Sequence, residues 1–538
     1  MSRSLSIALA QLNFCVGDIK GNTERILNVL QEQKNQADLV LFSELALSGY
    51  PPEDWLFRDD FYHSCETQLL RLQKASHEVS FLLGHPFREK GRLYNALSVF
   101  SEGKLLARYY KQCLPNHGVF DEARYFSPGK TTQILAFKGY RLGLLICEDL
   151  WHEGPVDSAK AAGAEILLSI NASPYDQKKY QRRQNMLSQH CLRTDLPLIY
   201  LNQVGGQDEL IFDGRSQVLN KTGETVLELP AFSEKTFLCE WKESQIKTKS
   251  LKVNPPEPFA EEYQALVMAL RDYVQKNGFQ GVLMGLSGGI DSALTLAIAV
   301  DALGKSKVRA YMMPSRYTPG DSVMYAQTQA KHLGVTFEIL SIEPIFEAFL
   351  SSLKGLLKED LKDITKENLQ ARCRGMLLMG LSNQLGDLVL TTSNKSETAV
   401  GYSTLYGDMA GGFNVLKDVP KTWVFSLAKY RNTLSEVIPK KVILRPPSAE
   451  LKPNQQDTDS LPPYAILDAI LEGYVERDRS VESLIEEGFE EEMVRHVISL
   501  VDRNEYKRRQ SPVGPRITAR NFSKDRRYPI TSGFSHNK

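Results

Sequence analysis

The 538-residue sequence has no excess of charge of either sign, because 65 lysines and arginines balance 65 aspartates and glutamates. Dedicated nucleic-acid-binding domains usually carry a clear basic excess, so we expect no nucleic-acid partner. The sequence also lacks long apolar runs. Runs such as residues 294–300 are far shorter than the roughly 20 residues of a membrane span. We therefore expect no membrane partner.

Paired cysteine motifs are absent as well. Seven cysteines occur, at positions 15, 65, 113, 147, 191, 239 and 373, and no two have Cys-x-x-Cys spacing. An odd number of widely spaced cysteines indicates neither a disulfide framework nor a zinc module. The N-terminus runs directly into a strand-like pattern without the apolar core of a signal peptide. These features predict a reduced, cytoplasmic setting.

Short apolar runs alternate with helical periods along most of the chain. Expected strands lie at 4–12, 38–43, 80–84, 93–100, 140–147, 165–171 and 196–202, then at 281–286, 307–313, 336–342 and 387–392. Expected helices lie at 23–36, 61–76, 176–193, 261–277, 291–303 and 366–385. This alternation predicts α/β architecture with a parallel sheet in the second part.

A polar and proline-rich stretch separates the two parts. It predicts domains at residues 1–241 and 261–538, joined by a linker at 242–260. The second domain ends in an acidic helix pair from about Glu476, followed by a basic tail. There are no internal repeats.

One glycine loop stands between an expected strand and an expected helix. Its residues are Gly285, Leu286, Ser287, Gly288, Gly289, Ile290, Asp291 and Ser292. The first N–H groups of a helix are unpaired at such a position, and adjacent glycines let a phosphate approach them closely. No Gly-Lys-Ser/Thr follows, so the loop is not a Walker motif. The alternative is an ordinary strand–helix turn.

This loop resembles the pyrophosphatase loop of adenylating amidotransferases, which convert ATP to AMP and pyrophosphate. Further fragments occur downstream in order: 367–372, Thr391-Thr-Ser-Asn-Lys-Ser-Glu397, Tyr406-Gly-Asp-Met-Ala-Gly-Gly412, 418–422, 445–451 and Lys524-Asp-Arg-Arg-Tyr-Pro529. Together they closely resemble the synthetase domain of glutamine-dependent NAD+ synthetases across residues 260–530. The resemblance implies a Rossmann-like ATP pyrophosphatase domain that uses ATP and Mg²⁺.

The resemblance also implies roles for individual residues. Residues 285–292, Thr392 and Lys421 match ATP contacts; Asn368, Arg372, Glu397 and Lys524 match deamido-NAD contacts; Asp291 and Glu397 match magnesium ligands. A solvated helix face for Arg372 and a charged surface tail for Lys524 are the alternatives. The chain departs from the resemblance at one position, because stand-alone ammonia-using synthetases have a lysine where this chain has Leu405.

Three residues in the first domain suit acyl transfer. Glu44 and Cys147 each end an apolar stretch, and Lys111 lies near another expected strand end. Because sites in open α/β sheets form outside the carboxyl ends of strands, we expect the three side chains to converge. Cys147 is then the nucleophile, Glu44 the base that takes and returns its proton, and Lys111 the cation that stabilises the oxyanion. Cys113, close to Lys111, lacks this strand-end setting.

The segments that carry these residues resemble the nitrilase superfamily across residues 4–240. The resemblance implies a four-layer α-β-β-α sandwich and amide hydrolysis through a thioester. In related glutaminase domains, the residues that match Ser173 and Lys179 contact the glutamine, and so does the tyrosine that His117 replaces here.

The sequence therefore predicts a ligase that takes ammonia from glutamine and transfers it to adenylated deamido-NAD. Deamido-NAD, ATP and glutamine are the expected small-molecule partners, and the resemblance implies a homo-oligomer. Three alternatives remain at this point: an adenylating ligase for another acceptor, an RNA-modifying enzyme with the same loop, and an amidase whose second domain is regulatory.

Overall fold

The computed structural model describes residues 3–242, 245–247, 257–357, 360–452 and 455–534. The chain divides into two compact units, Met1–Pro255 and Pro256–Lys538. β15, within the expected linker, extends the first unit's sheet to Ile246, and residues 248–256 of that linker lie outside the described part. The boundaries at 241 and 261 stay a prediction.

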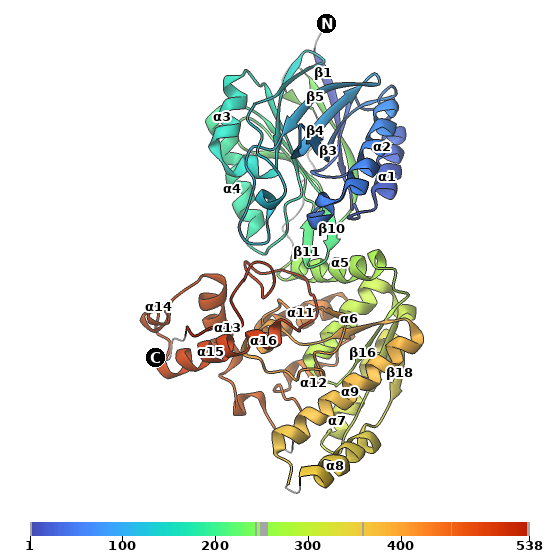
Figure 1. The fold of residues 1–538 in the computed structure, drawn as a ribbon, viewed down its shortest axis with the longest axis vertical. Coiled ribbons are helices and arrows are strands. Elements are labelled where there is room, and N and C mark those ends of the chain that lie inside the picture. The colour runs from blue at the N-terminus through green and yellow to red at the C-terminus, as the bar shows by residue number, and fades with distance from the viewer. Residues whose placement is uncertain (1–2, 243–244, 248–256, 358–359, 453–454, 535–538) are drawn as a thin grey trace. The chain divides into compact units, whose positions relative to one another are not determined.

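The N-terminal unit contains two large sheets (Figure 1). The seven-stranded sheet has the order β15 (Gln245–Ile246), β14 (Lys235–Lys242), β1 (Ser4–Gln11), β2 (Leu39–Leu41), β3 (Ser80–Glu89), β4 (Arg92–Ser101), β5 (Lys104–Tyr110). The six-stranded sheet has the order β13 (Thr225–Glu228), β12 (Gln217–Leu219), β9 (Leu198–Asn202), β8 (Ile166–Asn171), β7 (Tyr140–Ile146), β6 (Ile134–Phe137). A separate pair joins β10 (Val204–Gln207) to β11 (Leu210–Asp213).

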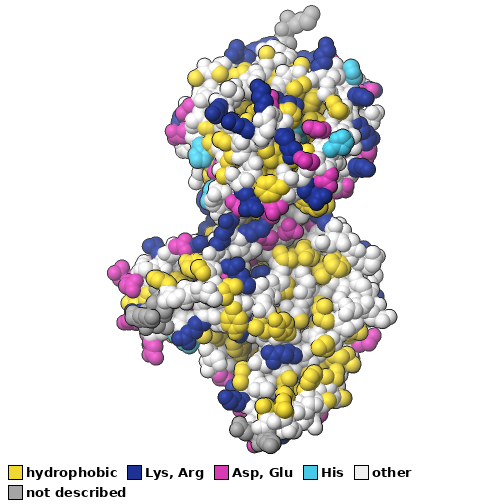
Figure 2. All heavy atoms as spheres, viewed as in Figure 1, with side chains coloured by type: hydrophobic (Ala, Val, Ile, Leu, Met, Phe, Trp, Pro, Cys, Tyr) yellow, Lys and Arg dark blue, Asp and Glu magenta, His cyan; other side chains and the backbone are white. Residues whose placement is uncertain are grey.

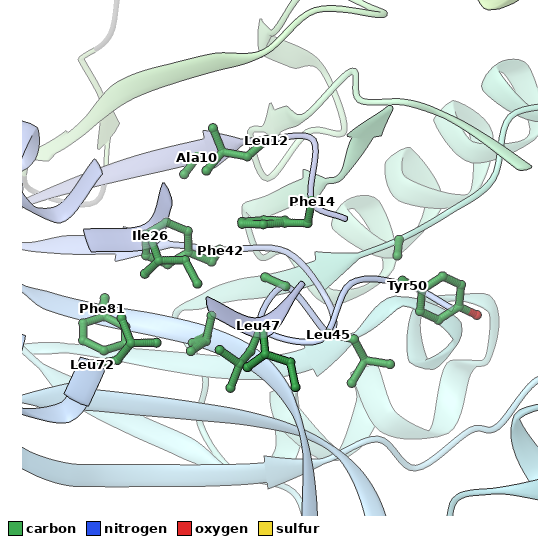
Figure 3. Packing of buried hydrophobic residues seen from close by; sticks show 14 of the residues in the cluster. Ala10, Leu12, Phe14, Ile26, Phe42, Leu45, Leu47, Tyr50, Leu72 and Phe81 are labelled. Carbon is green, nitrogen blue, oxygen red and sulfur yellow. The ribbon is translucent and has the colours of Figure 1, made fainter. Parts of the chain in front are cut away.

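Two helix layers enclose the two sheets. One apolar cluster, including Ile7, Leu41, Leu144 and Leu168, joins the facing sides of the sheets. α1 (Ile19–Gln33) and α2 (Asp59–Ala75) pack on the outer face of the larger sheet (Figure 3). α3 (Glu153–Ala161) and α4 (Lys179–Thr194) cover the smaller sheet. The expected α-β-β-α sandwich is confirmed.

The strands of this unit agree closely with the apolar runs of the sequence. Six of the seven expected strands lie within two residues of observed ones at both ends. In β8, the alternate residues Ile166, Leu168 and Ile170 all belong to the cluster between the sheets, as the two-residue period of a strand requires. β3 continues five residues beyond its expected end at Gly84, and the expected stretch 38–43 narrows to β2.

The C-terminal unit is built on a five-stranded parallel sheet. Its order is β18 (Thr336–Ile339), β17 (Val308–Met312), β16 (Val282–Gly285), β19 (Leu388–Thr391), β20 (Phe413–Asn414). Consecutive residues of the central strand β16, from Val282 to Met284, are fully buried, so both faces of the sheet are covered. The expected Rossmann-like parallel architecture is confirmed.

Helices surround this sheet and continue beyond it. They are α5 (Ala260–Lys276), α6 (Ile290–Leu303), α7 (Gly320–Leu333), α8 (Glu343–Leu357), α9 (Asp363–Leu385), α10 (Lys395–Val400), α11 (Lys421–Leu434), α12 (Lys440–Leu444), α13 (Tyr464–Leu471), α14 (Val481–Glu486), α15 (Glu491–Arg503) and α16 (Glu505–Arg508). α10, α13, α14 and α15 share a second apolar core. In the basic tail, Arg508, Arg516 and Arg526 are buried and paired with carboxylates.

The surface agrees with the balanced composition. On the face shown in Figure 2, lysines and arginines lie interspersed with aspartates and glutamates over the N-terminal unit. In the described part of the chain, no helix is long and apolar enough to cross a membrane.

Candidate active sites

Glu44 and Lys111 form a buried ion pair in the N-terminal unit. Glu44 follows β2, and Phe42, Leu45 and Leu47 on either side of it pack into the apolar core (Figure 3). Lys111 directly follows β5, and its Nζ lies 2.7 Å from Glu44 Oε1. Asn95 Nδ2 donates to the same oxygen at 2.8 Å, and the N–H of Ala172 donates to Glu44 Oε2 at 2.9 Å. Glu44 is therefore held from three sides.

A second glutamate, Glu122, also binds Lys111. Lys111 Nζ lies 2.8 and 2.9 Å from the two Glu122 oxygens, and the Tyr50 hydroxyl donates to Oε1 at 2.9 Å. Burial raises the pKa of Glu122 to about 7, although Lys111 opposes that shift. Burial would lower the pKa of Lys111, but Glu122 and Glu44 outweigh it and raise this pKa well above its usual range. Lys111 is therefore a cation at every ordinary pH.

Cys147 lies at the end of β7 and is the first residue of a short 3₁₀ helix, Cys147–Trp151. Its backbone φ is +43°, a left-handed conformation that is strained for a residue with a side chain. Burial and the nearby Glu44 raise the pKa of its thiol well above the usual value, against the opposing effect of Lys111. The resting thiol is therefore protonated, and attack requires that a base remove its proton.

All three residues follow the carboxyl ends of strands, as expected, but these strands belong to two different sheets. Glu44 and Lys111 follow strands of the seven-stranded sheet, whereas Cys147 follows a strand of the six-stranded sheet. The site therefore forms where the carboxyl ends of strands from two facing sheets meet. The layers of the sandwich bury the Glu44–Lys111 ion pair from both sides.

The residues expected at the glutamine lie in two groups. His117 and Lys179 flank Phe120: the His117 and Phe120 ring centroids are 5.9 Å apart, and Lys179 Nζ lies 5.5 Å from the Phe120 ring. Ser173 follows β8 and is buried, and its N–H donates to Asn202 Oδ1 at 2.9 Å. Ser173 adjoins Ala172, whose N–H contacts Glu44, so Ser173 lies beside the group formed by Glu44, Lys111 and Cys147 (the triad).

A cavity of about 290 Å³ in the C-terminal unit is lined by the glycine loop. All eight residues from Gly285 to Ser292 line it, together with Thr392, Glu397 and Lys421. Gly288 has φ +81°, and a Cβ there would come within 2.3 Å of the Ser322 carbonyl oxygen. The loop backbone thus takes a shape that only glycine permits at this position. The start of α6, with its unpaired N–H groups, faces the same cavity.

Two carboxylates and one lysine form a charged group in this cavity. Lys421 Nζ lies 2.6 Å from Asp291 Oδ2 and 2.9 Å from Glu397 Oε1. Asn394 Nδ2 donates to Asp291 Oδ1 at 2.8 Å, and its side chain also caps α10. Burial and the neighbouring Asp291 raise the pKa of Glu397 to about 7, while Lys421 opposes the shift. The carboxylates of Asp291 and Glu397 are therefore both directed toward the Lys421 ammonium.

The other expected dinucleotide contacts do not line this cavity. Asn368 and Arg372 lie one turn apart on α9, where Asn368 accepts a hydrogen bond from Thr404 and Arg372 Nε donates to the Leu405 carbonyl. Thr404 lines the cavity, so Asn368 adjoins it. Lys524 is exposed in the C-terminal segment.

Sequence reasoning missed three polar residues of these sites, namely Glu122, Asn95 and Asn394. Glu122 begins a short 3₁₀ helix, Glu122–Arg124, where no strand end or motif marks it. Asn95 lies inside β4, where a polar residue in an apolar run was the only signal. Asn394 belongs to a fragment that carried the resemblance, but no role was given to it.

Comparisons with known proteins agree with this geometry. A carbon–nitrogen hydrolase family model matches residues 6–248, and an NAD synthase family model matches residues 262–511. The glutamine-dependent NAD(+) synthetase of Acinetobacter baylyi is 51% identical over 537 residues, covering 99% of both chains. That of Xanthomonas campestris is 46% identical and covers 99% of this chain and 98% of its own.

A solved structure extends the likeness to three dimensions. The glutamine-dependent NAD+ synthetase of Acinetobacter baumannii, solved in complex with ADP, has a TM-score of 0.80 and 47% identity, with 99% of this chain and 100% of that chain covered. The two matched models define a protein with a carbon–nitrogen hydrolase domain followed by an NAD synthase domain. The chain belongs to the glutamine-dependent NAD(+) synthetase family.

Proposed function

We propose that this chain makes NAD+ from deamido-NAD, ATP and glutamine, with release of AMP, pyrophosphate and glutamate. The observation that carries the proposal is the presence of two distinct sites on one chain. One has a thiol beside a buried Glu–Lys pair, and the other has a glycine loop that lines a cavity together with two carboxylates. Each suits one half of an amidotransferase reaction.

In the first half-reaction, the Cys147 sulfur attacks the carboxamide carbon of glutamine while Glu44 takes the thiol proton. The Lys111 ammonium, fixed by Glu44 and Glu122, stabilises the charge on the carbonyl oxygen. Glu44 then returns the proton to the leaving nitrogen, and ammonia departs from a thioester. Water activated by Glu44 hydrolyses the thioester to glutamate and restores the thiol. Ser173, Lys179 and His117 are proposed to hold the amino-acid end of glutamine.

In the second half-reaction, the nicotinate carboxylate of deamido-NAD attacks the α-phosphorus of ATP and displaces pyrophosphate. Ammonia then attacks the adenylated carboxyl carbon and displaces AMP. The loop 285–292, Thr392 and Lys421 are proposed to bind ATP, because they line one cavity and present N–H groups and a cation to it. Asn368, Arg372, Glu397 and Lys524 are proposed to hold deamido-NAD.

Asp291 and Glu397 also fit a magnesium ion. Their oxygens lie 2.6 and 2.9 Å from the same Lys421 nitrogen, so both can face one small cation. Mg²⁺ is usually held by one or two carboxylates together with substrate phosphates. Among the described residues, no group of three or more His, Cys, Asp and Glu side chains is arranged for a metal ion. We therefore assign the ion to a site shared with ATP, where it would offset phosphate charge.

A homo-oligomer and a cytoplasmic location complete the proposal. Exposed apolar side chains on α8 and α9, including Leu356, Ile364 and Met376, support self-association. No disulfide joins any of the seven cysteines, all of which lie in the described part of the chain, and this supports a reducing compartment. Size-exclusion chromatography with light scattering tests the first point, since a monomer at working concentration would contradict it.

A turnover assay with each substrate omitted in turn tests the proposed reaction. NAD+ should require deamido-NAD, ATP and magnesium, together with either glutamine or ammonium. Asp291→Asn should abolish pyrophosphate release and leave glutaminase activity, because the amide loses the charge proposed to bind magnesium. AMP formation at the wild-type rate in that variant would contradict the assignment of the loop. Formation of AMP with another acceptor, or tRNA binding at physiological salt, would support the alternatives.

A further inference from the structure

Asp149 is a buried carboxylate that joins the Lys111 segment to the Cys147 segment. Asp149 Oδ1 accepts hydrogen bonds from the N–H groups of Gln112 and Cys113 at 3.0 and 2.9 Å. Asp149 Oδ2 accepts one from the Tyr109 hydroxyl at 2.8 Å and one from the Ile146 N–H at 3.0 Å. The side chain is fully buried.

These four hydrogen bonds surround the two catalytic positions. Tyr109, two residues before Lys111, and Gln112, one residue after it, are both tied to Asp149. Ile146 immediately precedes Cys147. Lys111 follows β5 of the seven-stranded sheet, and Cys147 follows β7 of the six-stranded sheet. The Asp149 carboxylate therefore joins the end of β5 in one sheet to the end of β7 in the other, directly beside Lys111 and Cys147.

We infer that Asp149 is a positioning residue that sets the distance between the Cys147 thiol and the Lys111 ammonium. The inference rests on the proposed glutaminase role of these two residues. Both Asp149 oxygens are occupied by backbone and tyrosine donors, so the side chain acts through its neighbours and not on the substrate. The left-handed φ of Cys147 needs such support, because strained backbone persists only where surrounding contacts hold it.

An aspartate suits this position better than its amide. A carboxylate accepts hydrogen bonds at both oxygens, whereas asparagine turns one of these acceptors into an NH₂ donor. In Asp149→Asn, that NH₂ group would face either the two N–H groups after Lys111 or the donors at Tyr109 and Ile146. One segment would then shift relative to the other, although side-chain size is unchanged.

Asp149→Asn should lower glutaminase kcat by about a hundredfold, the scale expected of a misplacement near 1 Å, with a much smaller change in the KM for glutamine. The pH profile of Cys147 alkylation by iodoacetamide should also shift, because the thiol and ammonium would separate. Ammonia-dependent NAD+ synthesis should not change. Tyr109→Phe, which removes one of the four hydrogen bonds, should have a weaker effect in the same direction. This variant replaces Asp149→Asn in the test if Asp149→Asn does not fold.

Asp38→Asn is the matched control. Asp38 accepts hydrogen bonds from the N–H and hydroxyl of Ser6 at 2.8 and 3.0 Å, at the end of β2 remote from Glu44. It should lower stability without the kcat loss or the alkylation shift. Wild-type glutaminase kcat and alkylation profile in Asp149→Asn, or equal effects in Asp38→Asn, would overturn the inference. If Cys147→Ala keeps glutaminase activity, the proposed function itself fails, and the two failures are thereby distinguished.

Discussion

At the residue scale, the N-terminal site places one cation between two carboxylates. Lys111 contacts both Glu44 and Glu122, and all three side chains are buried. Removing one partner of such a group leaves an uncompensated buried charge, which is strongly destabilising. The group therefore holds Lys111 in one position, as a fixed oxyanion site requires.

Glu122 should make stability depend on pH. Its pKa of about 7 lies above the roughly 4.3 of an unfolded glutamate, so the folded protein binds this proton more tightly. The resulting stabilisation is present below the unfolded pKa and is lost as pH rises through 7. In Glu122→Gln, the decline in unfolding free energy over this range should flatten by at most about 1.4 kcal/mol per pH unit.

Chemical denaturation of both proteins between about pH 5 and pH 8 measures this difference. The exposed Glu66→Gln is the control and should keep the wild-type slope. Parallel stability curves for wild type and Glu122→Gln would contradict the raised pKa.

Lys524 supplies a second residue-scale prediction. If it holds deamido-NAD, Lys524→Ala should remove a charge-assisted hydrogen bond of roughly 1.5–3 kcal/mol, or about ten- to a hundredfold in binding. The KM for deamido-NAD should rise far more than that for glutamine in steady-state assays. Equal KM values in variant and wild type would make Lys524 an ordinary surface charge.

At the element scale, the glycine loop depends on one backbone conformation. Gly288→Ala would force a Cβ to within 2.3 Å of the Ser322 carbonyl at φ +81°, a strain of about 1–3 kcal/mol. ATP-dependent AMP formation should fall sharply while glutaminase activity remains. Gly320→Ala is the control, since a Cβ there meets no atom within 4 Å. Normal AMP formation in Gly288→Ala would show that the loop shape is not required.

Elements were more predictable than the contacts between them. The strand before Cys147 and the helix after the glycine loop were predicted within one residue at each end, because apolar runs and glycines mark them locally. β5, which ends directly before Lys111, is predicted only as a nearby strand end, since charged residues such as Lys104 and Arg108 weaken its apolar pattern. The union of two sheets at the triad, and the place of Glu122 in it, depend on tertiary packing that no local pattern encodes.

At the scale of the whole molecule, two compact units each carry one complete group of candidate catalytic residues. The family match spans the chain, so both units belong to one enzyme family. Ammonia is mostly protonated at neutral pH, and only the neutral form attacks a carbonyl carbon. We therefore expect that ammonia supplied from outside can replace the ammonia released by the first unit, with an efficiency that rises with pH.

The most direct test is Cys147→Ala assayed with glutamine and, separately, with ammonium salt. We expect glutamine-dependent NAD+ synthesis to stop, because no thiol remains to form the thioester. Ammonia-dependent synthesis should persist and increase with pH, and Cys113→Ala should keep both activities. Glutamine-dependent synthesis that survives in Cys147→Ala would contradict the triad and the role assigned to the N-terminal unit.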